Sequence, residues 1–197
     1  MTSSCAGRRM VQVALLASLC GGLLAGCQRV PRGLELTSYQ DPYFPQRFRV
    51  AFDQCVYHVD GSGDIHIAGR AETAADDTAD AITSLLHIHV FWRPHPGATF
   101  VNPTGMSATL RYVEHSAAGT AVYGGTGFVY PRTQRDRTLL AQIDSGTLAL
   151  DSTTGRPPER IGDARLRGRL RARRDAHQTL DLMRTIKLHV GGAQSER

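Results

Sequence analysis

The sequence predicts a mainly β domain: an antiparallel β-sandwich, with a barrel as the alternative and a short helix at the C-terminal end. Apolar and polar residues alternate with a period of two from Phe48 onward, which is typical of half-buried strands. Glycine- and proline-rich segments separate these runs, as turns do in antiparallel sheets. The sequence lacks the regular alternation of strands and long helices that indicates a parallel α/β fold.

The alternating runs define the expected strands in chain order. They cover Phe48–Phe52, Val56–Val59, Ile65–Ala68, Leu86–Trp92, Ser107–Val113, Ala121–Tyr130, Thr138–Ala149 and Ala164–Arg174. Between them we expect turns at Pro94–Pro96, Asn102–Gly105, Gly124–Gly127 and Ser152–Gly162, because glycine and proline favour turn conformations. The alanine- and aspartate-rich segment Ala71–Thr83 is either a loop or a short helix.

The segment Thr179–Val190 fits both secondary-structure patterns, and we favour the helix. As a helix, it gathers its apolar residues on one side: Leu182, Met183, Ile186 and Val190. Asp175 is suited to cap the start of this helix, and Gly191 is suited to end it. As a strand, the same segment would be interrupted on its apolar face by Arg184.

The segment Asp60-Gly-Ser-Gly-Asp64 has some features of a calcium-binding loop. Asp60, Ser62 and Asp64 occupy the first, third and fifth ligand positions of an EF-hand loop. However, Ile65 stands where that loop needs glycine, and Ala71 stands where it needs a bidentate glutamate. We therefore predict a hairpin turn, with Asp60 opposite Asp64 and His58 opposite His66.

The N-terminal residues have the layout of a secretory signal. Arg8 and Arg9 precede an apolar run that ends at Cys27 and is too short to span a membrane. Leu24-Ala25-Gly26-Cys27 resembles a bacterial lipobox. Over its first 27 residues the chain is thus similar to bacterial lipoprotein precursors, which implies cleavage before Cys27 and its acylation. Cys20 is a poorer site, since Leu19 precedes it; the alternative is a plain signal peptide.

The resemblance implies a location in the cell envelope, held to a membrane by several acyl chains. Gln28 follows the cysteine, where an aspartate would suggest retention at the inner membrane. An outer membrane, with the protein facing the periplasm, is therefore favoured, and the inner membrane and the cell surface stay open.

Four regions follow from these patterns. We expect a signal peptide at 1–26, a lipid-anchored tether at 27–46, a single β-sandwich domain at 47–191 and a disordered C-terminus at 192–197. Pro31, Pro42 and Pro45 disfavour helices and central strands in the tether. Fully extended, the tether would hold the domain about 60 Å from the lipid.

Composition excludes few functions. The chain has 23 basic and 18 acidic residues, a formal net charge of +5. This excess is mild, and no nucleic-acid-binding motif is found, so no nucleic-acid partner is expected. The sequence contains no G-x-S-x-G, S-x-x-K or H-E-x-x-H motif. We therefore assign no catalytic residue, expect no cofactor and consider a non-enzymatic role more consistent with the sequence.

Cys55 is the one cysteine of the expected domain. It cannot form a disulfide within that domain, although an envelope location would permit one. We interpret it as a small buried apolar residue. The alternative is a disulfide to a partner protein.

His87 and His89 are the candidates for a metal site. On a strand they share one face, about 6–7 Å apart, a spacing that lets two imidazoles reach one zinc ion. His66, His95 and His115 could supply a third ligand. The simpler interpretation is a polar strand face, and the sequence by itself assigns no metal.

Alternate positions of Ala164–Arg174 carry arginine, and we call these five residues the arginine row: Arg165, Arg167, Arg169, Arg171 and Arg173. Small and apolar residues fill the positions between them, so the row should point away from the core. Guanidinium groups suit bidentate contacts with carboxylates or phosphates. The alternative is a solvated face whose charges protect an edge strand from pairing.

Taken together, the sequence predicts a lipid-anchored envelope protein with a non-enzymatic binding or scaffolding domain. Its expected partners are the membrane, through the anchor, and an anionic envelope component or an acidic protein at the arginine row. The alternative is a metal-dependent or other hydrolase that uses His87 and His89.

Overall fold

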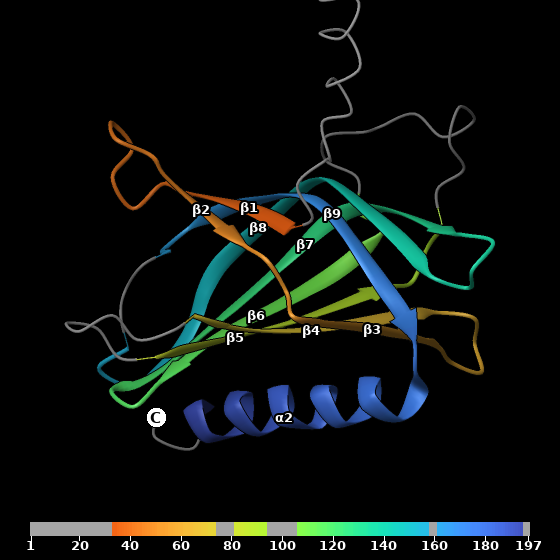
Figure 1. Ribbon diagram of the computed structural model, residues 1–197. Helices are drawn as coiled ribbons and strands as arrows, with labels where there is room; N and C mark the ends of the chain where they lie inside the picture. The colour runs from red at the N-terminus through yellow and green to blue at the C-terminus, as the bar shows by residue number, and fades with distance from the viewer. Residues whose placement is uncertain (1–32, 74–80, 94–105, 158–160, 195–197) are drawn as a thin grey trace, which may run out of the picture. The chain divides into compact units, whose positions relative to one another are not determined.

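The computed structural model describes residues 33–73, 81–93, 106–157 and 161–194 (Figure 1). Within these ranges the chain forms nine strands and one helix. The elements are β1 (Gly33–Ser38), β2 (Gln46–Val50), β3 (Gln54–Val59), β4 (Ile65–Thr73), β5 (Ile82–Val90), β6 (Ala108–Ser116), β7 (Gly119–Thr133), β8 (Leu139–Gly155), β9 (Ala164–Arg174) and α2 (Ala176–Gln194). The prediction of a mainly β domain with a short C-terminal helix is confirmed.

All nine strands belong to one sheet, in the order β2-β1-β9-β3-β4-β5-β6-β7-β8. β8 also pairs with β9, so the sheet returns to the strand near its other end. Neighbouring strands are antiparallel except β3 and β9, which are parallel and share only two residue pairs. The sheet therefore curves over on itself, and its inner face is closed around a core.

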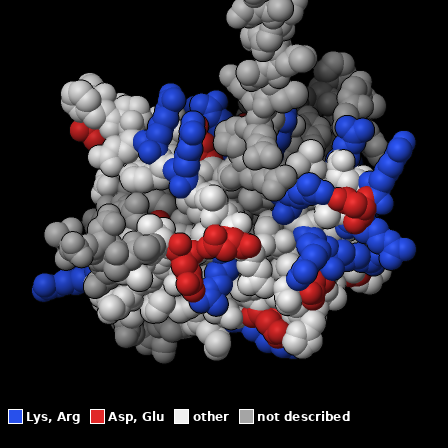
Figure 2. All heavy atoms as spheres, viewed as in Figure 1, with Lys and Arg blue, Asp and Glu red and all other residues white. Residues whose placement is uncertain are grey.

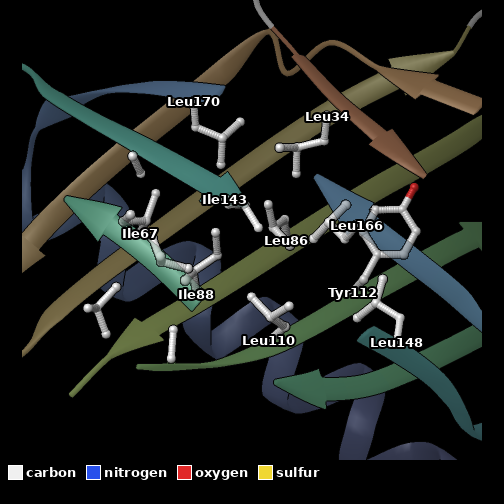
Figure 3. Close-up of a cluster of buried hydrophobic side chains, with 14 of the residues drawn as sticks. Leu34, Ile67, Leu86, Ile88, Leu110, Tyr112, Ile143, Leu148, Leu166 and Leu170 are labelled. Atoms are coloured by element: carbon white, nitrogen blue, oxygen red, sulfur yellow. The ribbon is translucent and has the colours of Figure 1, made fainter. Parts of the chain in front are cut away.

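The core lies between facing parts of this sheet, as in a sandwich. Side chains from β1, β8 and β9 meet side chains from β4, β5 and β6 in one cluster (Figure 3). Its labelled members are Leu34, Ile67, Leu86, Ile88, Leu110, Tyr112, Ile143, Leu148, Leu166 and Leu170. Each is no more than 4% exposed. The strand alternation seen in the sequence is thus the alternation between this core and the outer face.

Helix α2 covers part of the outer face. Leu182 and Ile186 pack there on apolar residues of five strands, namely Val56, Ala68, Leu85, Val113 and Val122. Asp175 caps the helix as predicted, because its Oδ1 accepts a hydrogen bond from the Gln178 amide at 3.0 Å. The helix continues past Gly191 to Gln194, so that glycine does not end it, and the prediction of disorder is wrong for 192–194. No helix in the described ranges is long and apolar enough to cross a membrane.

The hairpin predicted at Asp60–Asp64 is confirmed. β3 and β4 are antiparallel, with His58 opposite His66, and the Asp60 amide donates to the Asp64 carbonyl at 3.0 Å. The Asp60 Oδ1 atom accepts hydrogen bonds from the Ser62 amide, the Ser62 hydroxyl and the Asp64 amide, at 2.7–3.0 Å. Gly63 has a φ of 91°, which glycine adopts without strain. The loop oxygens thus hold the turn together.

Residues 33–46 differ from the prediction of a tether. Gly33–Ser38 is strand β1, which pairs with β2 on one side and β9 on the other. Leu34 and Leu36 are buried in the core, and Pro42 and Pro45 lie in the connection to β2. Proline disfavours central strands, but Pro42 and Pro45 lie outside β1, so they do not prevent this pairing. The domain therefore starts at β1 and not at residue 47.

The glycine-rich segment Gly124–Gly127 is also not a turn. It lies inside β7 and pairs with β6 and β8. A Cβ atom on Gly125 would stand 1.7 Å from the Thr147 carbonyl oxygen of β8, so glycine allows the two backbones to approach closely. The turns expected at Pro94–Pro96 and Asn102–Gly105 lie outside the described residues.

This close approach gives a stability prediction. Gly125→Ala should lower the free energy of unfolding by about 3 kcal/mol or more, because β8 must move to admit the methyl group. Gly61→Ala, where nothing lies within 4 Å of the added carbon, is the matched control and should change stability little. Urea unfolding followed by circular dichroism measures both. Equal stabilities of the two variants would contradict the close approach.

Candidate functional site

The arginine row lies on the outer face of β9, as its alternation predicted. All five arginines are exposed, whereas Ala164, Leu166, Leu170 and Ala172 are buried between them. Residues Ala164–Arg169 of β9 have β1 on one side and β8 on the other. The alternative that the charges protect an edge strand therefore does not apply to this part of β9.

Most of the row has nearby partners. Arg167 lies 3.5 Å from the Glu35 carboxylate, Arg171 forms an ion pair with Asp136, and Arg173 lies 3.7 Å from the Asp175 carboxylate. The Arg165 guanidinium lies over the Tyr39 ring, 5.5 Å from its centroid, within the range of cation–π contacts. Arg169 has no ion pair or hydrogen bond to any other described side chain. These partners come from other strands and loops and could not be identified from the row alone.

The basic surface extends onto the neighbouring hairpin. The strand registers place Glu35 between Arg49 and Arg167, and Thr37 between Arg47 and Arg165. Arg47 and Arg49 are exposed. Figure 2 shows basic side chains over the region of β1, β2 and β9, with acidic side chains among them. We call the five arginines of the row together with Arg47 and Arg49 the arginine face.

A cleft opens beside the row, where β9 passes from one neighbour to the next. Along β9, pairing with β1 stops at Arg169, which lies opposite Gly33, and pairing with β3 starts at Arg173. The cleft, which we call the seam cleft, has a volume of about 450 Å³ and is lined by Arg169, Arg171 and Arg173 on β9. Its other wall includes Phe52–Val56. Three arginines thus line one opening, an arrangement that suits an anionic ligand.

Cys55 lies in the wall of this cleft. Burial raises the pKa of its thiol to about 12, because the charged thiolate is poorly solvated there. The side chain is free of any disulfide and remains a neutral thiol near pH 7. This agrees with its interpretation as an apolar residue and gives the cleft no nucleophile from Cys55.

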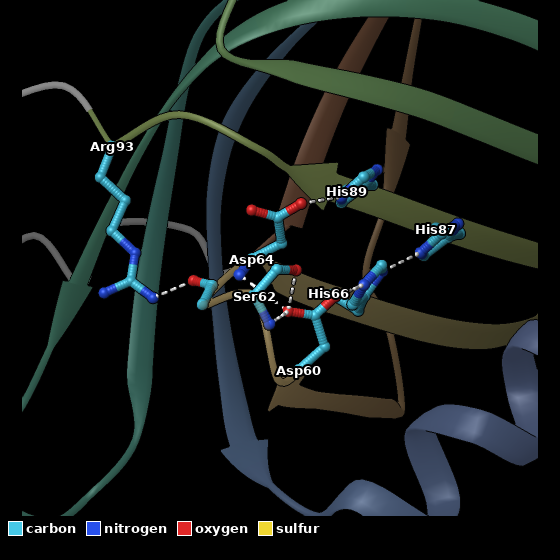
Figure 4. Close-up of polar contacts among 8 residues, drawn as sticks. Asp60, Ser62, Asp64, His66, His87, His89 and Arg93 are labelled. Atoms are coloured by element: carbon cyan, nitrogen blue, oxygen red, sulfur yellow. Dashed lines mark hydrogen bonds and ion pairs between the residues drawn. The ribbon is translucent and has the colours of Figure 1, made fainter.

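The candidate metal residues form part of a second cluster, on the outer faces of β3, β4 and β5 (Figure 4). His66 lies at its centre. The His66 ring lies within 27° of parallel to the rings of His58, His87 and His89, with centroid distances of 5.3, 5.4 and 4.5 Å. The sequence predicted the pairing of His58 with His66 but not the addition of β5, because the β4–β5 register depends on a long connection.

His87 and His89 share a face, as expected, but bind different partners. The His87 Nε2 atom lies 3.2 Å from the His66 Nδ1 atom, and the His66 Nε2 atom lies 3.3 Å from the Asp60 carboxylate. The His89 Nε2 atom donates to the Asp64 carboxylate at 2.8 Å. No group of three or more His, Cys, Asp or Glu side chains in the described ranges is arranged to hold a metal ion. His115 bonds Thr120 instead, and His95 lies outside those ranges.

His87, His66 and Asp60 form a chain of hydrogen bonds, and the positions of its protons follow from the Asp60 carboxylate. Hydrogen bonding by the Ser62 hydroxyl lowers the pKa of Asp60, so the carboxylate is ionised and the His66 Nε2 atom carries a proton. When His66 is neutral, its Nδ1 atom must accept, and the His87 Nε2–H group donates to it. This chain of hydrogen bonds therefore runs from His87 through His66 to Asp60, and it can hold or pass a proton.

Comparison of the chain with protein-family models, curated proteins and solved structures gives no match. What the domain does must therefore follow from its own residues. Two clusters are candidates for a binding site. The arginine face is exposed and adjoins a cleft. In the histidine cluster His66, His87 and His89 bond one another or a carboxylate, and the buried His58 Nδ1 atom has no hydrogen-bond partner among the described residues.

The histidine cluster gives a pH prediction. Burial, reinforced by His66, His89, Lys187 and Arg111, lowers the pKa of His87 to about 4. The unfolded chain, in which this pKa is about 6.5, binds the proton first as the pH falls. Folding stability should therefore fall between about pH 6.5 and pH 4, by up to about 3 kcal/mol from His87. It should be independent of this residue above pH 7.

Urea unfolding at pH 7 and at pH 4.5 tests this. His87→Gln should lose less stability between these two pH values than the unsubstituted protein does. His177→Gln is the control, because His177 lies on α2 with a side chain that is 88% exposed. An equal loss of stability in all three proteins would show that His87 does not resist protonation.

Proposed function

We propose that the chain is a lipid-anchored protein of the cell envelope whose folded domain is a non-enzymatic binding module. Its contact surface is the arginine face with the seam cleft, and its ligand is an envelope component that carries phosphate or carboxylate groups. The anchor is Cys27, and the favoured location is the outer membrane, facing the periplasm. This proposal rests on the lipobox residues and on the chemistry of the basic surface.

One observation carries the binding role: Arg169, Arg171 and Arg173 line a single cleft of about 450 Å³. Arginines this close repel one another unless anions offset their charge. Asp136 and Asp175 offset Arg171 and Arg173, so Arg169 is the one of these three arginines without an ion pair to another described side chain. Its guanidinium can form two parallel hydrogen bonds to a phosphate or a carboxylate.

The composition of the cleft favours binding over catalysis. Cys55 is a neutral thiol, and the other wall residues between Phe52 and Val56 include one carboxylate, Asp53, which accepts a hydrogen bond from the Glu72 amide at 3.2 Å. Exposed arginines continue from the cleft along β9 and, beyond Glu35 and Thr37 of β1, onto β2. Such an extended surface suits a polymer or a layer of charged groups better than a small substrate.

The first test concerns the anchor. In the native host grown with labelled palmitate, the unsubstituted chain should carry the label and Cys27→Ser should not, because the serine hydroxyl cannot form the thioether. Cys20→Ser is the matched control and should keep the label. Label that persists in Cys27→Ser would contradict the anchor site.

The second test concerns the arginine face. Binding to fluorescent polyphosphate and to polyglutamate, measured by anisotropy over a salt series, separates phosphate from carboxylate recognition. Arg167→Glu with Arg169→Glu should weaken binding at least about tenfold, because charged hydrogen bonds are lost and charges are reversed. The same charge change on α2, Arg184→Glu with Lys187→Glu, is the control. Equal affinities of both double variants would refute the proposed surface. The difference in affinity between the unsubstituted protein and the Arg167→Glu, Arg169→Glu variant should diminish as salt screens the charges.

A further inference from the structure

The connection between β1 and β2 exposes two neighbouring aromatic rings. Tyr43 is 86% exposed and Phe44 is 75% exposed, and the connection projects from the body of the domain (Figure 1). Exposing two adjacent aromatic side chains to water is unfavourable, because each would gain free energy by leaving it. We call residues 39–45 the hairpin tip.

The hairpin tip is held in shape by its own hydrogen bonds. The Asp41 Oδ1 atom accepts from the Tyr43 amide at 2.9 Å and from the Phe44 amide at 3.3 Å. Pro42 and Pro45 restrict the backbone on either side of the aromatic pair. At the base of the tip, the Arg165 guanidinium lies over Tyr39. The two rings are therefore presented outward by a defined turn.

Positive charge lies along the outer face of the same hairpin. Arg47, Arg49, Arg165 and Arg167 lie on one outer face of β2, β1 and β9, with Glu35 among them. Aromatic rings ahead of a basic surface match a membrane interface, where the rings enter the headgroup region and the arginines meet anionic headgroups.

The position of the lipobox favours a lipid surface as the occupant over a protein. Only residues 28–32 separate Cys27 from β1, so an acyl anchor would hold Gly33 within about 20 Å of the bilayer. β1 has six residues, about 20 Å in length. The base and the tip of the hairpin can therefore both reach the membrane when the hairpin lies along it.

We propose that the hairpin tip docks on the lipid surface that carries the anchor, with Tyr43 and Phe44 in the headgroup region and Arg47, Arg49 and Arg165 above anionic lipids. This inference rests on the proposed lipid anchor and adds a second attachment to it. Two attachments would fix the orientation of the domain, with the β1–β2 side toward the membrane and α2 away from it.

A tryptophan placed at the tip tests the docking directly, because the chain has a single tryptophan, Trp92. The probe chain carries Trp92→Phe and Phe44→Trp. The matched control carries Trp92→Phe and Leu188→Trp, since Leu188 on α2 is 76% exposed, almost the same as Phe44. Both full-length lipidated proteins are reconstituted in phosphatidylcholine–phosphatidylglycerol vesicles, with and without brominated acyl chains.

We expect the tryptophan at position 44 to lose fluorescence in brominated vesicles and to shift its emission to shorter wavelength, whereas the tryptophan at position 188 does neither. Omitting phosphatidylglycerol should reduce the loss, because the arginines would then lack anionic partners. Equal fluorescence changes at the two positions would overturn the docking. The docking would also be overturned if the emission of the tryptophan at position 44 were unchanged by vesicles but changed on binding a second copy of the protein or an acidic protein.

Flotation and mass spectrometry of the same samples separate this result from the anchor. If a chain acylated at Cys27 floats with the vesicles but its tryptophan at position 44 is not quenched, the result supports the anchor and contradicts the docking of the hairpin. Quenching at position 44 in a chain without acyl groups on Cys27 would support the hairpin and overturn the anchor. Circular dichroism confirms that both variants are folded.

Discussion

The rest of the fold depends on strand β9, because it is the strand at which the sheet closes. β9 pairs with β8 along one side, and along the other it pairs first with β1 and then with β3. Leu166 and Leu170 enter the core from this strand, where they complete the apolar side of a sheet that would otherwise stay open. A closed inner face requires strict alternation in β9, and that alternation places an arginine at every second position outside.

The change of neighbour along β9 leaves part of its edge without a strand partner, and the cleft lies at this edge. Between the last pair with β1, at Arg169, and the first pair with β3, at Arg173, three residues have no strand partner on that edge. The cleft at this edge is lined by the segment Phe52–Val56 and by arginine side chains. A single feature of the topology therefore provides both an opening in the outer surface and the charged groups around it. This coincidence favours the arginine face as the contact surface of the domain.

Local patterns in the sequence were sufficient for eight of the nine described strands, the Asp60–Asp64 turn and the Asp175 cap, because each depends on residues close together in the chain. Features that depend on contacts between residues far apart in the chain could not be predicted. β1 was missed because its two buried leucines, Leu34 and Leu36, find their partners in β2 and β9. The partners of the arginine row could not be assigned for the same reason. The sequence around Gly125 predicts a turn, because the close approach of β8 that requires glycine there is a long-range contact.

The geometry of the histidine cluster also bears on where a ligand binds. The His66 and His87 rings are within 12° of parallel, with centroids 5.4 Å apart and facing nitrogens 3.2 Å apart. Each nitrogen therefore points nearly along the line to the other, so that a proton lies between them. A metal would need both lone pairs to turn toward a third point, which breaks this hydrogen bond. Rotation of His66 would also remove its contact with Asp60, which holds the β3–β4 turn. His66 thus supports the hairpin turn through Asp60, whereas Arg169 on the arginine face has no ion pair or hydrogen bond to another described side chain.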